Sequence, residues 1–336
     1  MFKEANNLSM KVAWFDAEDW EKEYLEDKEY DLEIDFFEES LNSETVELAE
    51  GYDAVAVFVS SDVNGEVLDS LDADLVACRS TGFDHVDTEK AREQGIDVCN
   101  VPYYGANTVA EHTFGLILAL SRKIYSAIRK VDEGDFDHEG LRGFDLEGKK
   151  LGVVGTGSIG KHVIQMANGF GMDVIASDPK PDHEAAEELG FMYVSNEDLF
   201  RQSDIITLHC PLVEQTEHLL SEEEFDLMDG TVLVNTARGG LIDTEALIEA
   251  LEKDQVKSAG LDVLEEECFL EDDIGYLSEM EDECDPKTIL EDHILIDRED
   301  VLITPHNAFN SIEALQRITD TTLDNLENRK NVVNGF

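Results

Sequence analysis

The sequence predicts an α/β protein of two domains, each built on a doubly wound parallel sheet. Short apolar runs alternate with stretches of helical spacing in two separate blocks, and one long helical stretch lies between the blocks. Such an alternation buries its apolar faces best as a parallel sheet covered by helices. The length of 336 residues also suits two domains of ordinary size.

The first block predicts three strands, at residues 12–15, 54–59 and 75–78. Acidic segments with helical spacing flank these apolar runs, so the expected order is strand, helix, strand, helix, strand. From residue 106 to residue 130 the apolar residues follow helical spacing, and neither glycine nor proline occurs after Gly115. We expect one long helix here that bridges the two domains.

The second block resumes the alternation after a turn-rich region. Apolar runs predict its strands at residues 151–154, 174–177, 205–209, 232–235 and 258–263. A last strand at 301–304 is followed by an amphipathic helix at 311–328, which is expected to return the chain to the first domain. We therefore place the first domain at 1–104 plus 305–336 and the second, inserted in it, at 105–304.

The segment from 265 to 300 is rich in acids and shows no clear helical pattern, so we interpret it as a surface excursion of the second domain. Asp282, Asp285 and Glu291 do not follow the spacing of a calcium-binding EF-hand loop, which also needs a central glycine. No metal site is predicted.

The charge balance is the most unusual property of the composition. The chain has 78 acidic and 25 basic residues, a formal net charge of −53. A field of this sign repels phosphates, so nucleic acids and anionic membrane surfaces are disfavoured as partners. High salt would screen the self-repulsion, since the Debye length falls to about 3 Å at 1 M. We favour a salt-rich cytoplasm over a solubility or lineage effect as the origin of the acidity.

The sequence also indicates a cytoplasmic protein with reduced thiols. Its longest apolar run, residues 113–120, is far shorter than the roughly 20 residues of a membrane helix, and the N-terminus is acidic where a signal peptide is basic. The cysteines are odd in number and lack a CxxC pair, which indicates neither a disulfide framework nor a zinc site. We expect mostly buried thiols at Cys78, Cys99, Cys210, Cys268 and Cys284.

A glycine-rich turn, LGVVGTGSIG at residues 151–160, lies between a predicted strand and a predicted helix. In that context Gly155 makes the tight turn, Gly157 lets the backbone approach a pyrophosphate, and Gly160 lets helix and strand pack closely. The N–H groups and the dipole of the helix N-terminus favour phosphate there. Asp178 ends the next strand, where a carboxylate can bind the ribose hydroxyls and repels the extra phosphate of NADP. The motif predicts a Rossmann domain that binds NAD in preference to NADP.

Three further segments follow predicted strands: VNTARGGLID with Arg238, GLDVLEEE with Glu267, and ITPHNAF with His306. Ligands of open α/β sheets collect at the carboxyl ends of the strands, so these residues can converge. Arg238 offers a planar fork for a carboxylate, His306 can exchange a proton near neutral pH, and Glu267 can orient the imidazole. This set suits hydride transfer to a 2-oxo acid. The adjacent Glu265 and Glu266 are alternatives to Glu267.

These segments, in this order and spacing, resemble the signatures of the D-isomer-specific 2-hydroxyacid dehydrogenases, most closely the fermentative D-lactate dehydrogenases. Similar segments occur almost from end to end: RSTGFDHVD, NVPYYGANTVAEH, GTGSIG, LHCPL, VNTARGG, GLDVLEEE and TPHNAF. The resemblance implies a flavodoxin-like substrate (catalytic) domain with an inserted Rossmann NAD-binding domain. It also implies that Arg238 binds the substrate carboxylate and polarises the carbonyl, that His306 exchanges the proton, and that Glu267 raises the pKa of His306.

The same resemblance implies a wider set of contacts and a homodimer formed through the nucleotide-binding domain. The cofactor would be met by Gly155, Gly157, Ser158, Ile159, Gly160, Asp178, Cys210, Pro211, Thr216, Thr236, Ala237, Arg238 and Asp262. The substrate would be met by Phe58, Thr81, Gly82, Tyr104, Arg238 and Phe309. Of these, the main-chain N–H groups of Thr81 and Gly82 would bind the carboxylate, and the three aromatic rings would select the side chain.

Among possible activities, we favour reduction of pyruvate by NADH to D-lactate, because the aromatic rings of Phe58 and Tyr104 suit a methyl group. One alternative is a sister enzyme that acts on hydroxypyruvate, glyoxylate or a branched 2-oxo acid. Another is an NAD-sensing corepressor in which catalysis is incidental, although the acidity of the chain disfavours a place near DNA. The expected partners are a small 2-oxo or 2-hydroxy acid and a second copy of the chain.

Overall fold

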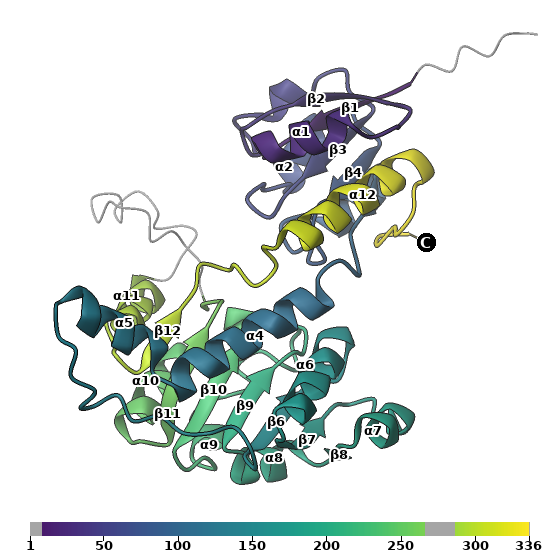
Figure 1. Ribbon diagram of the computed structural model, residues 1–336. Helices are drawn as coiled ribbons and strands as arrows, with labels where there is room; N and C mark the ends of the chain where they lie inside the picture. The colour runs from purple at the N-terminus through teal and green to yellow at the C-terminus, as the bar shows by residue number, and fades with distance from the viewer. Residues whose placement is uncertain (1–8, 266–285, 336) are drawn as a thin grey trace, which may run out of the picture. The chain divides into compact units, whose positions relative to one another are not determined.

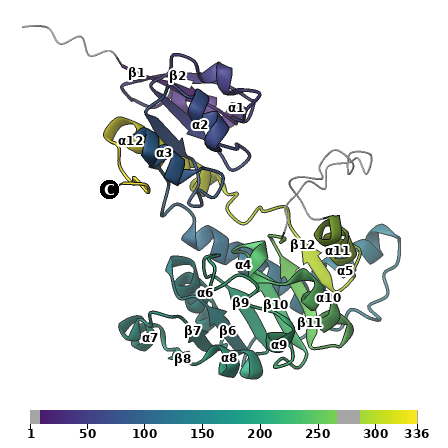
Figure 2. The same ribbon diagram turned by 180° about the vertical axis from the view of Figure 1, so that it is seen from behind.

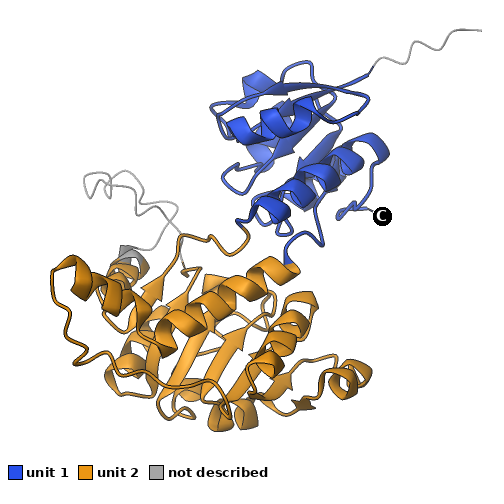
Figure 3. Ribbon diagram, viewed as in Figure 1, with its two compact units in different colours: residues 1–105, 310–336 blue, residues 106–309 orange. Residues whose placement is uncertain are grey.

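The computed structural model describes residues 9–265 and 286–335 (Figure 1). The chain divides into two compact units, Met1–Gly105 with Asn310–Phe336 (unit 1) and Ala106–Phe309 (unit 2), which Figure 3 draws in blue and orange. Each unit contains a sheet of parallel strands. The α/β class with two doubly wound sheets, as predicted from the sequence, is confirmed.

Unit 1 contains a five-stranded sheet in the order β2-β1-β3-β4-β5, which is the strand order of flavodoxin-like folds. Its strands are β1 (Met10–Trp14), β2 (Leu32–Phe36), β3 (Ala54–Val57), β4 (Leu75–Cys78) and β5 (Asp97–Cys99). Its helices are α1 (Asp19–Glu26), α2 (Gly65–Ser70), α3 (Thr88–Gln94) and α12 (Ile312–Asn328), with a 3-10 turn at Val46–Ala49.

Successive residues of β1 point to opposite faces of this sheet and so join two cores. Val12 packs in one core with Leu25 of α1 and Leu326 of α12, while Ala13 packs in the other with Val67 of α2. Helices therefore cover both faces. The predicted C-terminal helix is found within one residue of its expected start, and it packs in unit 1 as expected.

Two strands of unit 1, β2 and β5, were not predicted. β2, with the sequence LEIDF, is an edge strand in which acids alternate with apolar residues, so only one of its faces is partly buried. β5 has three residues, which is too short to give a pattern. Buried parallel strands are recognised by a continuous apolar run. An edge strand such as β2 and a short strand such as β5 lack that run.

Unit 2 contains a seven-stranded sheet in the order β12-β11-β10-β9-β6-β7-β8. Read from β8, this is the Rossmann order 3-2-1-4-5-6 with one further strand. Its strands are β6 (Lys150–Val154), β7 (Asp173–Ser177), β8 (Met192–Tyr193), β9 (Ile205–Leu208), β10 (Thr231–Asn235), β11 (Val256–Leu261) and β12 (Val301–Ile303). Its helices are α4 (Ala106–Ser121), α5 (Ile124–Asp132), α6 (Ser158–Gly169), α7 (His183–Leu189), α8 (Asn196–Gln202), α9 (Glu222–Phe225), α10 (Thr244–Glu252) and α11 (Pro286–Ile296), with a 3-10 turn at Gly239–Leu241.

The two faces of this sheet carry separate cores. Val153 of β6 packs with α4 and α6 on one face, represented by Ile117 and Ile164, whereas Val154 packs with α8 and α10 on the other, represented by Phe200 and Leu247. Figure 2 shows the sheet from the side opposite to α4. The sheet edge at which the strands end is therefore held between two helical layers.

The long helix predicted at 106–130 is wrong in one respect, because it is two helices. α4 ends at Ser121, Lys123 adopts a left-handed backbone conformation (φ 50°), and α5 begins at Ile124. The main-chain N–H of Phe144 donates to the Ser121 carbonyl (2.9 Å). A Cβ on Gly143 would lie 2.0 Å from that carbonyl oxygen. A loop that crosses the helix here takes the hydrogen bond that the next turn would need.

The expectation for the acidic segment 265–300 also needs correction. This segment was expected to have no helix, but it contains α11. The residues of α11 that are described pack on unit 2 through Leu295, which is 1% exposed. Residues 266–285, with Cys268, Asp282, Cys284 and Asp285, lie outside the described residues.

The second crossing between the units lies at 309/310, whereas we had expected it at 304/305. The reason is the buried side chain of Asp262, which accepts hydrogen bonds from the main-chain N–H groups of Asn307 (2.9 Å) and Ala308 (2.8 Å). These bonds tie residues 305–309 to β11. His306 thus belongs to unit 2 and not to the first domain, where the sequence analysis placed it.

Candidate active site

The carboxyl ends of six neighbouring strands form a row across unit 2. The last residues of β7, β6, β9, β10, β11 and β12 pair in register: Ser177, Val154, Leu208, Asn235, Leu261 and Ile303. The segments that leave this row carry, in the same order, Asp178, Gly155, Cys210, Arg238, Asp262 and His306. The sheet brings the predicted cofactor-binding and catalytic segments to one edge, as expected of an open α/β sheet.

The glycine turn fits a bound dinucleotide. Gly155 has φ +93°, and a Cβ there would lie 2.7 Å from the main chain of His209, while a Cβ on Gly160 would lie 2.1 Å from the Gly155 carbonyl. The protein's own packing requires both of these glycines. Gly157 differs, because its φ is −66° and a Cβ would meet nothing within 4 Å. Neither strain nor packing explains Gly157, and the close approach of a phosphate to its backbone stays a prediction.

The N-terminus of α6 is open as well. The N-cap Gly157 has no side chain to accept from the first N–H groups, whereas Asp182, Ser195 and Asp243 cap α7, α8 and α10. The N–H groups of the first turn, at Ser158 and Ile159, have no partner within a helix. They and the helix dipole suit a pyrophosphate.

Asp178 is held as an anion beside this turn. Its Oδ2 accepts from the main-chain N–H and hydroxyl of Thr156 (2.8 and 3.0 Å), and its Oδ1 accepts from the N–H of Lys180 (2.8 Å). Partial burial acts to raise the pKa of Asp178, but the hydrogen bonds from Thr156 and Lys180 outweigh it and lower the pKa below its ordinary value. A carboxylate has about four acceptor sites, so room remains for ribose hydroxyls.

The Asp178→Asn variant should therefore lose discrimination between the two nicotinamide cofactors. Without the negative charge, kcat/KM with NADH is expected to fall about 10-fold or more, and the ratio of NADPH to NADH activity to rise by a similar factor. Steady-state rates with both cofactors measure this. The matched control is Asp173→Asn, which removes an exposed charge from the other end of β7. An unchanged NADPH to NADH ratio in Asp178→Asn would contradict the assignment.

The segment that carries Arg238 is held by a buried asparagine. Asn235 is fully buried at the end of β10, its Nδ2 donates to the Arg238 carbonyl (2.8 Å), and its Oδ1 accepts from the N–H of Ala237 (3.0 Å). Arg238 itself donates from Nη1 to the Ala237 carbonyl (2.7 Å) and is partly exposed. At Gly239 a Cβ would overlap the main chain of Leu264. The guanidinium thus extends from a rigid turn.

The segment that carries His306 is held by Asp262. The N–H of His306 donates to the Asp262 carbonyl (2.9 Å), and the two N–H groups that follow, at Asn307 and Ala308, donate to its carboxylate. His306 has φ +46°, a left-handed conformation that costs a non-glycine residue about 1–3 kcal/mol. The hydrogen bonds to Asp262 offset that cost. The imidazole lies edge-on to the ring of Phe309, with centroids 6.5 Å apart.

Asp262 was predicted to contact the nicotinamide end of the cofactor, and that contact stays a prediction. The side chain is 1% exposed. Burial acts to raise its pKa, but hydrogen bonds from His112, Thr304 and the N–H groups of Asn307 and Ala308 hold the pKa below its ordinary value. The carboxylate is therefore a charged buried anchor for the loop that carries His306.

Of the three adjacent glutamates, Glu265 is engaged elsewhere. Its Oε1 is hydrogen-bonded to Nε2 of His218, and its Oε2 accepts from the main-chain N–H (3.1 Å) and hydroxyl (2.6 Å) of Thr244. These contacts argue against Glu265 as the partner of His306. Glu266 and the predicted Glu267 lie outside the described residues.

The remaining predicted cofactor residues flank the same edge. Thr236 is buried, with its hydroxyl 2.9 Å from that of Thr113. Thr216 closes a turn by donating to the Pro211 carbonyl (2.6 Å). The free thiol of Cys210 is partly buried, and desolvation raises its pKa to about 11.

The other two described cysteines, Cys78 and Cys99, are free and buried, as expected. Desolvation raises the pKa of Cys78 to about 12 and that of Cys99 to about 11. Neither thiol is suited to act as a nucleophile.

Four of the predicted substrate residues belong to unit 1. Phe58 follows β3, donates its N–H to Oδ2 of Asp16 (3.0 Å) and lies beneath the guanidinium of Arg79. Thr81 donates its hydroxyl to the Val101 carbonyl (2.7 Å). Each residue is fixed within unit 1, as are Gly82 and Tyr104, whose carbonyls accept from Ser80 Oγ and Arg317 Nε (both 2.6 Å). Arg238, His306 and Phe309 belong to unit 2.

Several residues that build this edge were missed by the sequence analysis: His112, Thr113, Thr156, Asn235 and Thr304. The signal for Asn235 was available, because a buried amide after an apolar strand usually binds the turn that follows. The contacts by which His112 and Thr113 reach this edge, with Thr304 and Thr236, span 123 residues or more, so no local pattern marks them.

Among the described residues, no cluster of three histidine, cysteine or carboxylate side chains could hold a metal ion. The described helices also include none that is long and apolar enough to cross a membrane.

Comparison with known proteins agrees with this geometry. The family model "D-isomer specific 2-hydroxyacid dehydrogenase, NAD binding domain" matches residues 114–308. The chain is 39% identical over 330 residues to the D-lactate dehydrogenase of Escherichia coli. The aligned residues cover 95% of this chain and 96% of that protein.

Two solved structures of similar fold are informative. The pyruvate reductase of Chlamydomonas reinhardtii has a TM-score of 0.86 at 35% identity, with 96% of each chain covered. The D-lactate dehydrogenase of Aquifex aeolicus, complexed with NAD and lactic acid, has a TM-score of 0.83 at 29% identity, with 97% of this chain and 99% of that chain covered.

The Rossmann sheet, the glycine turn and the matched domain define an NAD-dependent oxidoreductase. More specifically, the chain belongs to the D-isomer specific 2-hydroxyacid dehydrogenase family. The predicted family, cofactor and enzyme class are confirmed.

Proposed function

We propose that this enzyme is a D-lactate dehydrogenase, which converts pyruvate, NADH and a proton to D-lactate and NAD. The observation that supports the proposal most is the shared sheet edge, which carries the cofactor turn after β6, Arg238 after β10 and His306 after β12, with one strand between each pair. The E. coli relative and the Aquifex structure bear the same activity in their names.

In this proposal Arg238 binds and orients the substrate. Its guanidinium forms charge-assisted hydrogen bonds to the carboxylate and draws electron density from the adjacent carbonyl. The main-chain N–H groups of Thr81 and Gly82 add donors to the same carboxylate. Because Asn235 already fixes the main chain of the turn, little backbone entropy is lost there when the substrate binds.

His306 holds the proton. In reduction its imidazolium donates a proton to the carbonyl oxygen as NADH supplies the hydride, and in oxidation the neutral imidazole accepts the hydroxyl proton. Glu267 would orient the imidazole and stabilise its charged form. The left-handed backbone that Asp262 stabilises sets the direction in which the ring leaves the loop.

We assign the choice of side chain to Phe58, Tyr104 and Phe309, with unit 1 as the substrate domain and unit 2 as the NAD domain. Bulky rings favour the methyl group of pyruvate over larger groups. A substrate panel with chiral product analysis tests this assignment. We expect the highest kcat/KM with pyruvate and D-lactate as product. A kcat/KM more than tenfold higher with hydroxypyruvate, glyoxylate or a branched 2-oxo acid, or formation of L-lactate, would overturn it.

The assay should be run across a range of KCl concentrations, because we also propose that the acidity reflects a salt-rich cytoplasm. The chain has a net charge of −53, and its acidic side chains repel one another less as added salt shortens the Debye length. Activity is therefore expected to rise with salt.

We further propose that the enzyme is a homodimer formed through unit 2. α5 has no buried residue, and Ile124, Tyr125, Ile128 and Val131 are 45–54% exposed along it. Apolar residues gathered in this way mark an interaction surface. Two copies of so acidic a chain can approach only where acids are scarce.

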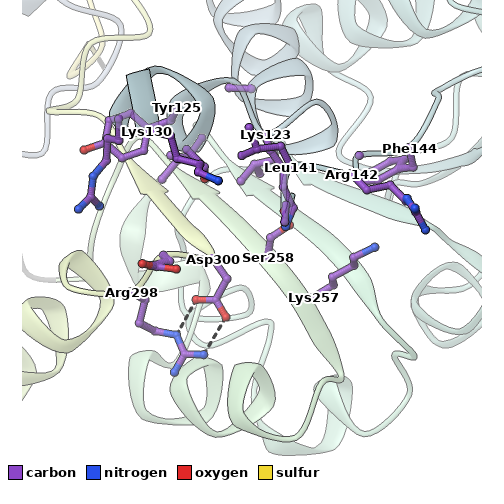
Figure 4. Close-up of a pocket in the computed structure, with 18 of the residues that line it drawn as sticks. Lys123, Tyr125, Lys130, Leu141, Arg142, Phe144, Lys257, Ser258, Arg298 and Asp300 are labelled. Atoms are coloured by element: carbon purple, nitrogen blue, oxygen red, sulfur yellow. Dashed lines mark hydrogen bonds and ion pairs between the residues drawn. The ribbon is translucent and has the colours of Figure 1, made fainter. Parts of the chain in front are cut away.

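A cavity of about 730 Å³ beside α5 meets that condition (Figure 4). It lies near the start of β11, where Lys257 and Ser258 line it, and so away from the strand-end row. Its basic lining residues are Lys123, Arg129, Lys130, Arg142, Lys257 and Arg298, and its acidic ones are Glu133, Glu139, Glu299 and Asp300. Bases thus outnumber acids here, although acids exceed bases threefold in the whole chain.

The Ile128→Asp variant is expected to convert the dimer to a monomer, because it places a carboxylate in the apolar contact. Light scattering coupled to gel filtration in concentrated KCl measures the mass. Met192→Asp is the control, since Met192 is 67% exposed on the edge strand β8 and remote in sequence from α5. A monomeric wild type, or a dimer that persists in Ile128→Asp, would contradict the proposal.

A further inference from the structure

We propose that His112 is a positioning residue, which acts through Asp262 to hold the loop that carries His306. The inference rests on the proposed function, because it gives that loop a catalytic purpose. His112 lies on α4, the first helix of unit 2, and its side chain is 22% exposed.

The contacts of His112 define its hydrogen-bonding state. Its Nε2 lies 3.1 Å from Oγ1 of Thr304 and 3.2 Å from Oδ1 of Asp262. The hydroxyl of Thr304 itself donates to the same Oδ1 (2.5 Å). Because an ionised carboxylate only accepts, the Nε2 of His112 carries a hydrogen and donates it.

His112 differs in origin from the other donors to this carboxylate. Thr304 Oγ1 and the N–H groups of Asn307 and Ala308 belong to the loop that Asp262 holds. His112 comes from a helix 192 residues earlier in the chain than Thr304. It therefore connects the loop to the layer of helices on one face of the sheet.

The next residue on α4 makes a corresponding contact with the segment that carries Arg238. The hydroxyl of Thr113 lies 2.9 Å from that of Thr236, and both residues are buried. Thr236 precedes Ala237 and Arg238. Two consecutive residues of one helix thus contact the segments that carry Arg238 and His306. The N–H of Asp262 also donates to the Asn235 carbonyl (2.9 Å), so the main chain joins the two segments and α4 adds a side-chain contact to each.

This arrangement predicts how loss of the His112 donor acts. Asp262 would keep its main-chain bond to Asn235 and its bonds to the loop, but its carboxylate would lose its link to α4. The carboxylate, and with it the loop that it holds, would then shift relative to the Arg238 turn. Small displacements of a proton donor lower the rate of the chemical step strongly, by about 10²-fold for 1 Å. Binding of the cofactor, which depends on the glycine turn and Asp178, should change little.

A matched pair of variants tests the inference. His112→Gln and His112→Met have side chains of similar length, but only glutamine can donate to Asp262. We expect His112→Met to lower kcat for pyruvate reduction about 10- to 100-fold, with KM for NADH within about 3-fold of wild type, and His112→Gln to restore most of the loss. His293→Met, an exposed histidine on α11, is the control and should behave as wild type.

Hydrogen exchange at residues 304–308 gives a readout independent of activity. Exchange of the Asn307 and Ala308 amides should be about tenfold faster in His112→Met than in His112→Gln. Equal exchange and equal kcat in the two variants would overturn the inference. An inactive wild type together with faster exchange in His112→Met would support the His112 contact and contradict the proposed function.

Discussion

Replacement of His306 by glutamine is expected to lower kcat for pyruvate reduction by about 10²- to 10⁴-fold, the usual contribution of a placed general acid. Glutamine can still donate a hydrogen bond, but it cannot release a proton to the carbonyl oxygen. The loop should persist, because the main-chain N–H groups of residues 306–308 and the Thr304 hydroxyl donate to Asp262. Steady-state oxidation of NADH in concentrated KCl measures the effect.

The control for this variant is His138→Gln, in which a fully exposed imidazole of the same unit is changed. Affinity for NADH, followed by its fluorescence, should be within about 3-fold of wild type in both variants, because the glycine turn is untouched. If His306→Gln kept more than a tenth of the wild-type kcat, His306 would not be the proton donor.

Replacement of Arg238 by lysine is expected to lower kcat/KM for pyruvate by about 10²- to 10³-fold. Lysine keeps the positive charge but loses the planar fork that forms two parallel hydrogen bonds to a carboxylate. Each charge-assisted hydrogen bond contributes about 1.5–3 kcal/mol. Both kcat and KM should change, since the same contact binds the substrate and polarises its carbonyl.

Arg201→Lys serves as the matched control, because Arg201 is an exposed residue of α8 paired with Glu197 one helical turn away. It should leave kcat/KM unchanged. A kcat/KM for Arg238→Lys within tenfold of wild type would show that bidentate binding of the carboxylate is not the role of Arg238.

The strands of unit 2 could be predicted because parallel strands buried on both faces are continuous apolar runs. All but the short edge strand β8 were expected within about two residues of their observed bounds. Features that depend on distant contacts were not predictable. The break after Ser121 is caused by a hydrogen bond from Phe144, and the position of the crossing at 309/310 by the side chain of Asp262.

The candidate site shows the same division. Gly155, Gly157 and Asp178 could be identified from spacing, because each has a task in one strand, turn and helix unit. The segments of Arg238 and His306 were found through their resemblance to family signatures. The residues that hold these segments in place differ in how far they reach along the chain. Asn235 bonds its own turn, while His112 and Thr113 contact residues 123 or more positions away. Sequence spacing carries no record of such contacts.

The measurement that tests the proposed function most directly is kcat/KM of wild type for pyruvate with NADH in concentrated KCl, determined beside Arg238→Lys and His306→Gln. We expect wild type to reach at least about 10⁴ M⁻¹s⁻¹, the lower end of typical enzymes, and both variants to be at least about 100-fold slower. A wild type as slow as the two variants at every salt concentration would contradict the account. That result would favour a protein whose role is to sense NAD and not to catalyse a reaction.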